Sequence, residues 1–527
     1  MILPNDTDYE VGQDNVEIFG LDIHNPVFFI SGGIIVLFVF FVAVFQEPAS
    51  AFFGWLRPAV TDTFDWLLAI SANIFVVFCI ALIFSPFGSI RLGGRDAKPD
   101  FTYTGWFAML FAAGMGIGLM FYGVSEPVSH FTAAFADGAG TPESWAPLSG
   151  AAGDADAARR LSMAATIFHW GLHPWAIYAV VGLALAFFSY NRGLPLTIRS
   201  AFYPLLGERV WGWPGHVIDV LAVFATLFGL ATSLGIGAEQ ANAGLNHLFG
   251  MPVTETSKVL LIIGITAIAL FSVVAGLDAG VKRLSEINMV LAALLLMFVI
   301  IVGPTFAILS GFLDYLGAYI VYLPVLSNPI GRTDQNFFDG WTAFYWAWWI
   351  SWSPFVGMFI ARVSRGRTVR EFLISVLLIP SALCMLWMTT FGATALDQVI
   401  EQGSSAIVDA SLELQLFIML EELPLAAITS FLGIVLVVVF FVTSSDSGSL
   451  VIDTITAGGK VDAPIPQRVF WAIFEGLVAV VLLLAGGLAA LQAAAITTGI
   501  PFAIVLLGMC VAIWKGLSSE RAALQGI

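Results

Sequence analysis

The 527-residue chain is short of charge: only 11% of its residues are Asp, Glu, Lys or Arg, while 59% are hydrophobic. A water-soluble domain carries about a quarter charged residues, so the deficit calls for an apolar surrounding. This composition excludes an ordinary water-soluble enzyme or binding domain. It predicts an integral membrane protein.

Cysteine and basic residues are scarce as well. The three cysteines, Cys79, Cys384 and Cys510, fall in apolar segments, which argues against a disulfide framework and predicts small packing residues. The chain has 21 Lys and Arg against 37 Asp and Glu, and its net charge of −16 makes nucleic acid an unsuitable partner. Residues 1–26 contain no Lys or Arg, so we expect no separate cationic signal peptide.

Long apolar runs dominate what is present. A helix needs ~20 apolar residues to cross the hydrocarbon layer, and we count twelve such runs between residues 27 and 514. The alternation over ~10 residues that marks membrane β-strands is missing. The sequence therefore predicts an all-α polytopic membrane protein with twelve transmembrane helices.

The positions of the basic residues predict the orientation of these helices. All but five of the 21 Lys and Arg fall in the tail or in loops that follow even-numbered spans. Cationic loops stay in the cytoplasm, which predicts a multi-pass plasma (inner) membrane protein with both termini cytoplasmic. The five on the other side are Arg57, Arg159, Arg160, Lys258 and Arg332.

The spans divide into two extra helices and two blocks of five. Because five is odd, the second block enters the membrane from the opposite side, as in transporters with an inverted repeat. The expected units are an N-terminal tail (1–26), two extra helices (27–102), a first repeat (103–312), a connecting surface helix (313–337), a second repeat (338–514) and a short tail (515–527).

Each repeat opens on a helix with a predicted interruption, which in such folds points to the binding site. The first reads FAAGMGIGLMFYG and contains Gly114, Gly116 and Gly118. The second reads WAWWISWSPFVG and contains a Ser-Pro pair at 353–354. Close helix packing also uses small residues, but glycines at alternate positions favour unwinding, which frees backbone N–H groups for a carboxylate.

Tryptophans gather where a simple interfacial belt does not account for them. Trp170, Trp175 and Tyr178 lie on one side of a predicted helix, and Trp349 and Trp352 lie about halfway along another. Together they predict an aromatic enclosure near the middle of the bilayer. Such an enclosure attracts a diffuse, weakly hydrated cation by ~2 kcal/mol or more once water is excluded. Quaternary ammonium compounds have this character.

Several of these segments resemble the betaine–choline–carnitine transporter family. The resemblance is carried by GMGIGLMFYGVSEP, FHWGLHPWAIY, FYWAWWISWSPFVGMFIARVSRGRTVREF and FFVTSSDSGS, and it runs from about residue 20 over nearly the whole chain. It implies a five-plus-five inverted repeat preceded by two helices, often assembled as a homotrimer. It also implies an onium site at Trp170, Trp175, Tyr178 and Trp349, with Trp352 beside it and the substrate carboxylate facing the glycines.

The resemblance further implies a substrate class. Choline-transporting members tend to carry Asp where this chain has Gly118, and a carboxylate there would repel a zwitterion. Glycine betaine is therefore the expected substrate, taken up by secondary active transport for osmoprotection. Carnitine, dimethylsulfoniopropionate and ectoine stay open as other zwitterions.

Sodium is the coupling ion that the resemblance implies, and no other cofactor is expected. One family sodium site resembles Ala112, Met115, Phe440, Thr443 and Ser444, which supply the oxygen ligands that a hard cation prefers. A second keeps Thr226 and Phe355 but has Leu230 where another threonine would be. Since leucine offers no oxygen, two sodium ions per cycle are not assumed.

Three other functions are alternatives. A proton-coupled or sodium-independent choline or carnitine transporter of the same family is the nearest. A membrane metalloenzyme is more distant, and would use His169 and His173, which lie four residues apart on one helix face. A channel needs a continuous pore, whereas the sequence predicts one enclosed aromatic site.

Overall fold

The computed structural model describes residues 7–114, 116–136, 144–274 and 278–525. These residues contain ten helices long and apolar enough to cross a membrane, with α5 and α6 counted together, and the bent pair α3–α4 makes an eleventh candidate. The ten are α1 (Val27–Val44), α2 (Gln46–Phe84), α5 (Ala155–Trp170) with α6 (Leu172–Tyr190), α8 (Trp213–Phe249), α9 (Glu255–Val274), α10 (Asp278–Val302), α11 (Thr305–Leu326), α14 (Val369–Ile400), α17 (Ala426–Thr456) and α18 (Ile465–Gln525).

The remaining elements connect or complete these helices. α3 (Tyr103–Gly114), α4 (Ile117–Phe135) and α13 (Phe344–Val363) are central to the site. The short ones are α7 (Tyr203–Leu206), α12 (Gln335–Phe337), α15 (Ser405–Asp409), α16 (Gln415–Glu421), η1 (Pro86–Ser89), η2 (Arg199–Phe202), η3 (Gly207–Trp211) and η4 (Phe338–Ala343).

The difference from twelve spans has two physical sources. α18 is 61 residues long, which at ~1.5 Å per residue is about three times the hydrocarbon thickness. It is divided by Gly486 and Gly487, whose backbone is not helical, and this break lies close to the boundary between the last two apolar runs, 469–488 and 490–514. α13 is not among the ten, because its indole, phenol and hydroxyl groups lower its hydropathy.

The helix that follows α10 also begins earlier than predicted. The span expected at 286–311 ends at Val302, and α11 begins at Thr305 after Gly303 and Pro304. Proline lacks a backbone N–H, so it ends one helix and is tolerated where the next begins. α11 is itself one of the ten candidate spans.

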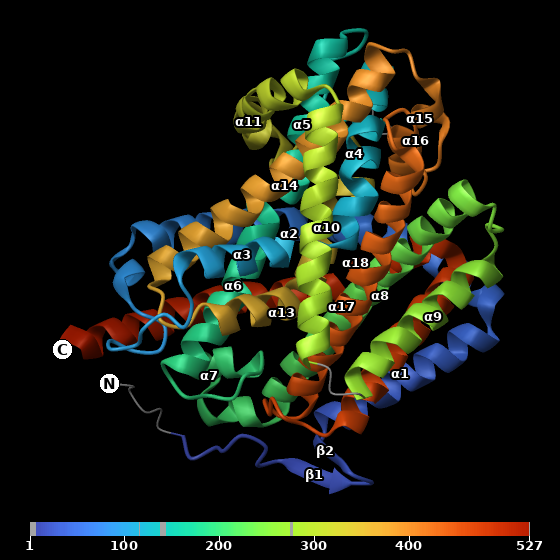
Figure 1. Cartoon of the computed structure of the whole chain (residues 1–527). Coiled ribbons are helices and arrows are strands. Elements are labelled where there is room, and N and C mark those ends of the chain that lie inside the picture. Colours follow the sequence, from blue (N-terminus) through green and yellow to red (C-terminus); the bar gives the residue numbers. More distant parts are fainter. Residues whose placement is uncertain (1–6, 115, 137–143, 275–277, 526–527) are drawn as a thin grey trace.

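The predicted all-α fold is wrong in one detail, since the N-terminal tail contains a β-hairpin. β1 (Asn15–Ile18) pairs antiparallel with β2 (Leu21–His24) around a two-residue turn. Phe19 and Gly20 both have positive φ, as a type I′ turn requires. The hairpin lies at the bottom of the molecule, at the opposite end from α15 and α16 (Figure 1).

Burial separates the central helices from the peripheral ones. In the most apolar stretch of α5–α6, 94% of residues are buried, against 28% to 33% in α1, α9, α10 and α11. The peripheral helices expose apolar faces that suit lipid contact. The three cysteines are buried and free, as predicted. The helices that carry the predicted site therefore lie inside the protein.

Candidate functional site

The predicted interruption of the first glycine helix is confirmed. α3 ends at Gly114, α4 begins at Ile117, and their axes differ by 63°. Gly116 between them is fully extended, and no side chain caps the N-terminus of α4. The first N–H groups of α4 therefore have no intrahelical acceptor, and a helix N-terminus with free N–H groups attracts anions.

The matching interruption predicted in the second helix is wrong. α13 runs without a break from Phe344 to Val363 and accommodates Pro354 in its interior. Its neighbouring hydroxyls find backbone acceptors, because Ser353 Oγ donates to Ile350 O at 2.7 Å and Ser351 Oγ to Ala495 O at 3.2 Å. The irregular turn comes earlier, at the π-helical segment η4.

The two aromatic groups come from the join between α5 and α6 and from α13. Trp170 is the last residue of α5, and Gly171 breaks the helix so that α6 starts again at Leu172. Trp175 and Tyr178 then lie in the first two turns of α6. The helix break thus turns residues from two helices toward one point.

All eight residues predicted for the substrate site line one central cavity. The lining consists of Ala113, Gly114, Gly116, Gly118, Leu119, Trp170, Pro174, Trp175, Tyr178, Ser233, Trp348, Trp349, Trp352 and Cys384. Its volume is only about 40 Å³, room for a few water molecules. A larger guest must therefore move side chains apart.

The rings of the cavity are held by one another and by hydrogen bonds. The Trp349 ring lies 4.9 Å from that of Trp170 and is stacked on Trp348 at 4.6 Å. Its indole nitrogen donates to His169 O at 2.9 Å, and that of Trp352 donates to Gly229 O at 2.9 Å. These bonds fix the aromatic faces before any guest arrives.

One buried donor of the cavity is left over. The indole N–H of Trp175 has no hydrogen-bond partner in the described part of the chain, although the side chain is 2% exposed. An unpaired buried N–H is costly. A guest with a hydrogen-bond acceptor would satisfy it.

Two glycines shape the cavity in opposite ways. A Cβ on Gly118 would lie 2.8 Å from Trp170 Cη2 and 3.0 Å from Trp348 Cη2. A Cβ on Gly116 would meet nothing within 4 Å. Gly118 is therefore needed for the two indoles to approach, whereas Gly116 borders open space.

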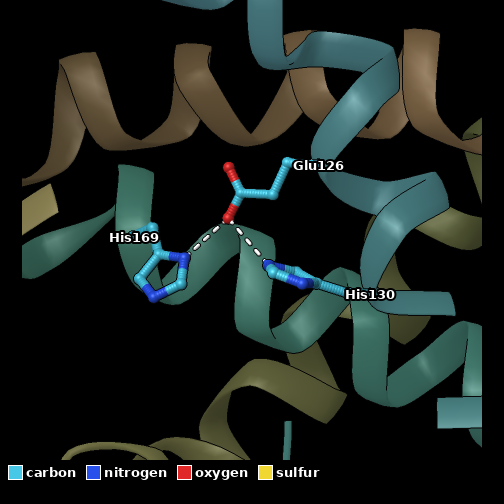
Figure 2. A group of neighbouring side chains, drawn as sticks. All are labelled: Glu126, His130 and His169. Atoms are coloured by element: carbon cyan, nitrogen blue, oxygen red, sulfur yellow. Dashed lines mark hydrogen bonds and ion pairs between the residues drawn. The ribbon is translucent and has the colours of Figure 1, made fainter. Parts of the chain in front are cut away.

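A buried carboxylate that the sequence analysis missed holds the aromatic wall in place. Figure 2 shows Glu126 between the imidazoles of His130 and His169, and its Oε1 lies 3.1 Å and 2.6 Å from their nitrogens. Its Oε2 accepts hydrogen bonds from Trp170 Nε1 at 2.7 Å and from the Tyr345 hydroxyl at 2.5 Å. One side chain of α4 thus ties α5 to α13 next to the central cavity.

The ligand atoms of Glu126, His130 and His169 lie within 4.8 Å of one another, a spacing that a metal ion could use. The carboxylate already makes four hydrogen-bonded contacts, however, which fill its acceptor capacity. The cluster therefore needs no ion to be satisfied. In the sequence, this cluster is indicated by Glu126, the acidic residue of VSEP. An ionisable group inside an apolar helix is a candidate functional residue by default.

The pairing of His169 with His173 is wrong. The second nitrogen of His169 contacts Thr342 Oγ1 at 2.9 Å, whereas His173 contacts Asn73 Oδ1 at 2.9 Å. The Trp346 ring packs against both imidazoles. The two histidines therefore serve different helix contacts and do not share a metal.

A second cavity of about 130 Å³ adjoins the first and shares Ala113 and Trp352 with it. It is lined by four of the five residues of the first predicted sodium site, namely Ala112, Phe440, Thr443 and Ser444. Met115 lies outside the described residues. The Thr443 hydroxyl donates to Val439 O at 3.0 Å, so its oxygen lone pairs stay available to a cation.

The two residues of the doubtful second sodium site, Thr226 and Phe355, belong to α8 and α13. Phe355 lines the second cavity. Thr226 is buried in α8 and donates to Ala222 O at 2.7 Å. Leu230 packs against Gly448 of α17, where a Cβ would be 2.3 Å from its methyl carbon. Apolar packing thus occupies the place where a second threonine was sought.

Comparison with known proteins fits this arrangement. Residues 26–522 match the family model described as BCCT, betaine/carnitine/choline family transporter. A glycine betaine/proline/choline transporter of Vibrio parahaemolyticus serotype O3:K6 is 64% identical over 98% of this chain and 94% of its own length. Glycine betaine transporter 1 of the same strain is 55% identical, covering 98% of both chains.

A more distant relative extends the match to another group of bacteria. A glycine betaine transporter of Bacillus subtilis strain 168 is 44% identical over 92% of this chain and 95% of its own length. The family model covers nearly the whole chain, and the relatives named here are transporters, not enzymes. The chain belongs to the betaine/carnitine/choline family of transporters.

Proposed function

We propose that this protein imports a zwitterionic quaternary ammonium osmolyte, with glycine betaine as the principal substrate, together with sodium. The observation that carries the proposal is the central cavity, where Trp170, Trp175, Tyr178 and Trp349 face the broken glycine segment. The aromatic faces suit a desolvated onium group. The names of the 64% and 55% identical relatives, which both include glycine betaine, support the same substrate.

The other side of the cavity suits a carboxylate. The uncapped N-terminus of α4 and the unpaired indole N–H of Trp175 are both donors that need an acceptor. Gly118 keeps this side free of negative charge. A guest with an onium group at one end and a carboxylate at the other satisfies both walls, which favours a zwitterion over choline.

Sodium coupling is supported by the second cavity. Hydroxyl oxygens of Thr443 and Ser444 lie there next to Ala112 of α3, and oxygen ligands are what a hard cation prefers. α3 leads directly into the broken segment that faces the substrate. An ion between α3 and α17 would therefore stabilise the same helix end that shapes the substrate cavity.

Alternating access completes the proposal. The second cavity is lined by Ser285 and Met289, which follow Lys282 and Arg283 along α10, and the charge distribution predicts that this end of α10 is cytoplasmic. We propose that the five-helix blocks rock about the central cavity, so that it opens to one side at a time. Both termini would be cytoplasmic in the inner membrane, and the functional unit would be a homotrimer.

The test is uptake into proteoliposomes that contain the purified protein. Radiolabelled glycine betaine, choline, carnitine and proline are offered with sodium and proton gradients imposed separately. Sodium-driven betaine accumulation with the lowest KM among the four is the expected result. Uptake driven by a proton gradient alone, or sodium-independent exchange of carnitine, would establish the alternative transporter of the same family.

A further inference from the structure

A third cavity lies beyond the central one, at the end of the molecule opposite the sodium residues. Its volume is about 330 Å³. The lining residues are Arg57, Tyr122, Ser129, Trp145, Gly340, Trp341, Leu412, Leu488 and Gln492. None of them lines the central cavity, so this outer cavity is a separate space. It has the size of a small-molecule site.

Arg57 of α2 brings a guanidinium group to the outer cavity. In the described residues its guanidinium has no hydrogen bond, and no carboxylate lies within 4.0 Å of it. Asp62 and Asp339 line the neighbouring cavity on the other side of Arg57. Asp339 accepts hydrogen bonds from Gln335 Nε2 at 2.9 Å and 3.0 Å.

The other cationic side chains predicted for this side of the membrane are all paired. Arg159 lies 3.4 Å from Glu401, Arg160 lies 3.4 Å from Asp314, Lys258 lies 3.4 Å from Glu239 and Arg332 lies 2.6 Å from Asp334. Arg57 is the exception among the five in the part of the chain that the structure describes. A planar guanidinium with free donors binds a carboxylate in a bidentate manner.

Aromatic rings form the wall and floor of the same cavity. The rings of Trp341 and Tyr122 pack edge to face at 5.9 Å. The Trp145 ring covers Gly340, where a Cβ would lie 2.3 Å from Trp145 Cζ3. Trp145 is 51% exposed, so it forms the rim. Aromatic faces beside a free guanidinium suit a guest with an onium group and a carboxylate.

The outer cavity and the central cavity are separated by aromatic side chains. The Tyr122 ring lies 6.3 Å from that of Trp170 and 6.1 Å from that of Trp348, and both indoles line the central cavity. One layer of aromatic rings therefore separates the two spaces. A guest in the outer cavity needs only this layer to part before it reaches the central site.

We propose that the outer cavity is a capture subsite for the zwitterion, in which Arg57 binds the carboxylate while Tyr122 and Trp341 bind the onium group. This inference rests on the proposed function, because it takes the same substrate class as the central site. It adds a specificity element, since Arg57 attracts a zwitterion's carboxylate and repels choline, which carries only positive charge.

The test compares Arg57→Gln with Arg57→Lys in proteoliposome uptake. Arg57→Gln should raise the KM for glycine betaine roughly tenfold with kcat unchanged, because one charge-assisted contact is lost. The same variant should leave the KM for choline unchanged or lower it, since a repulsive charge is removed. Arg57→Lys keeps the charge but not the bidentate geometry, so its betaine KM should fall between the two.

Arg160→Gln is the matched control, because it removes an equal charge from the same predicted side at a residue already paired with Asp314. It should leave both KM values unchanged. Trp341→Ala should raise the KM for betaine and choline alike, since both carry the onium group. Melting temperatures in detergent would show that each variant is folded.

Two failures are distinguishable. If wild-type protein takes up no betaine, the proposed function is wrong. If wild-type uptake depends on sodium and betaine, yet Arg57→Gln shifts the betaine and choline KM values equally or shifts neither, the capture subsite is wrong and the central site stands. Should Arg57→Gln fail to fold, an unchanged betaine KM in Arg57→Lys would overturn the proposal in the same way.

Discussion

Replacement of Trp349 tests the aromatic site most directly. Its side chain is 6% exposed, lines the central cavity and stacks on Trp348. Loss of one desolvated cation–π face of ~2 kcal/mol corresponds to roughly a 30-fold weaker affinity. Trp349→Leu keeps much of the volume and removes the ring, so it should show most of this loss. Trp349→Phe keeps a ring face and should lose only severalfold.

A buried tryptophan also contributes to stability, so this effect needs a matched control. Trp346 is 1% exposed on the same helix and packs against His173 and Phe168 outside the cavity lining. Trp346→Leu should lower the melting temperature as much as Trp349→Leu does, since either change of a buried indole costs a few kcal/mol. Its betaine affinity should stay near that of the wild type.

The assay is equilibrium binding of radiolabelled glycine betaine to detergent-solubilised protein, followed by uptake KM in proteoliposomes. Binding measured this way does not depend on tryptophan fluorescence, which the substitutions alter. The reasoning would be refuted by equal affinities of the Trp349→Leu and Trp349→Phe variants. That outcome would mean that the ring's electrostatic face contributes nothing and that only its volume matters.

Three more predictions concern the glycine segment, the sodium residues and the N-terminal hairpin. Gly118→Ala places a Cβ 2.8 Å from an indole carbon, so the KM for betaine should rise at least about tenfold. Gly116→Ala places its Cβ in open space and should change this KM little. Uptake kinetics compare the two variants, and equal KM values would contradict the steric explanation. Ser444→Ala should raise the sodium concentration for half-maximal uptake. Ser447→Ala should not, because Ser447 lines the same cavity but lies outside the predicted ligand set. A sodium titration at saturating betaine compares the two variants, and identical curves would exclude Ser444 as a ligand. The hairpin docks on η2 through His24, whose Nε2 lies 3.0 Å from a guanidinium nitrogen of Arg199. Burial and this guanidinium lower the pKa of His24 from 6.5 to about 3, so the undocked hairpin binds more protons than the docked one below pH 6.5, and docking should weaken as the pH falls from about 7 toward about 4. Hydrogen exchange of residues 15–24 should accelerate over that range in the wild type and much less in His24→Gln; parallel acceleration in both would contradict the assignment.

Much of the site could be predicted because the residues that form it are unusual inside a membrane span. Tryptophan in the middle of a span and glycine at alternate positions have few structural explanations. Trp170, Trp175, Tyr178 and Trp349 do come together, and Gly116 does interrupt its helix. These features depend on local sequence, which a single chain displays directly.

The errors came from contacts between distant residues. Pro354 suggested a break in α13, but the Ser353 hydroxyl donates to Ile350 O, the carbonyl that lacks the Pro354 N–H as its helical donor, so the helix continues. The spacing of His169 and His173 predicts one helix face, but the break at Gly171 places them on α5 and α6, and each contacts a different helix. Glu126 went unnoticed because its four partners come from three segments up to 219 residues apart.

The N-terminal β-hairpin was not predicted for a different reason. Val16 and Ile18 alternate with polar residues before Phe19 and Gly20, a short-range signal that attention to long apolar runs overlooked. The number of spans depends on how α13 and α18 are counted. Length and hydropathy describe a helix in isolation, whereas neighbours decide whether it bends, as at Gly487 with φ 59°.

The central cavity is smaller than the second cavity and the outer cavity, and this difference affects how tightly a substrate can bind. With about 40 Å³ at the centre, the cavity has room for only a few water molecules. A substrate must move the indoles apart to bind there. Part of its interaction energy is then used to open the cavity, so the measured affinity is weaker than the contacts alone would give. If the substrate binds there as proposed, the return of the rings to this narrow arrangement would favour its release.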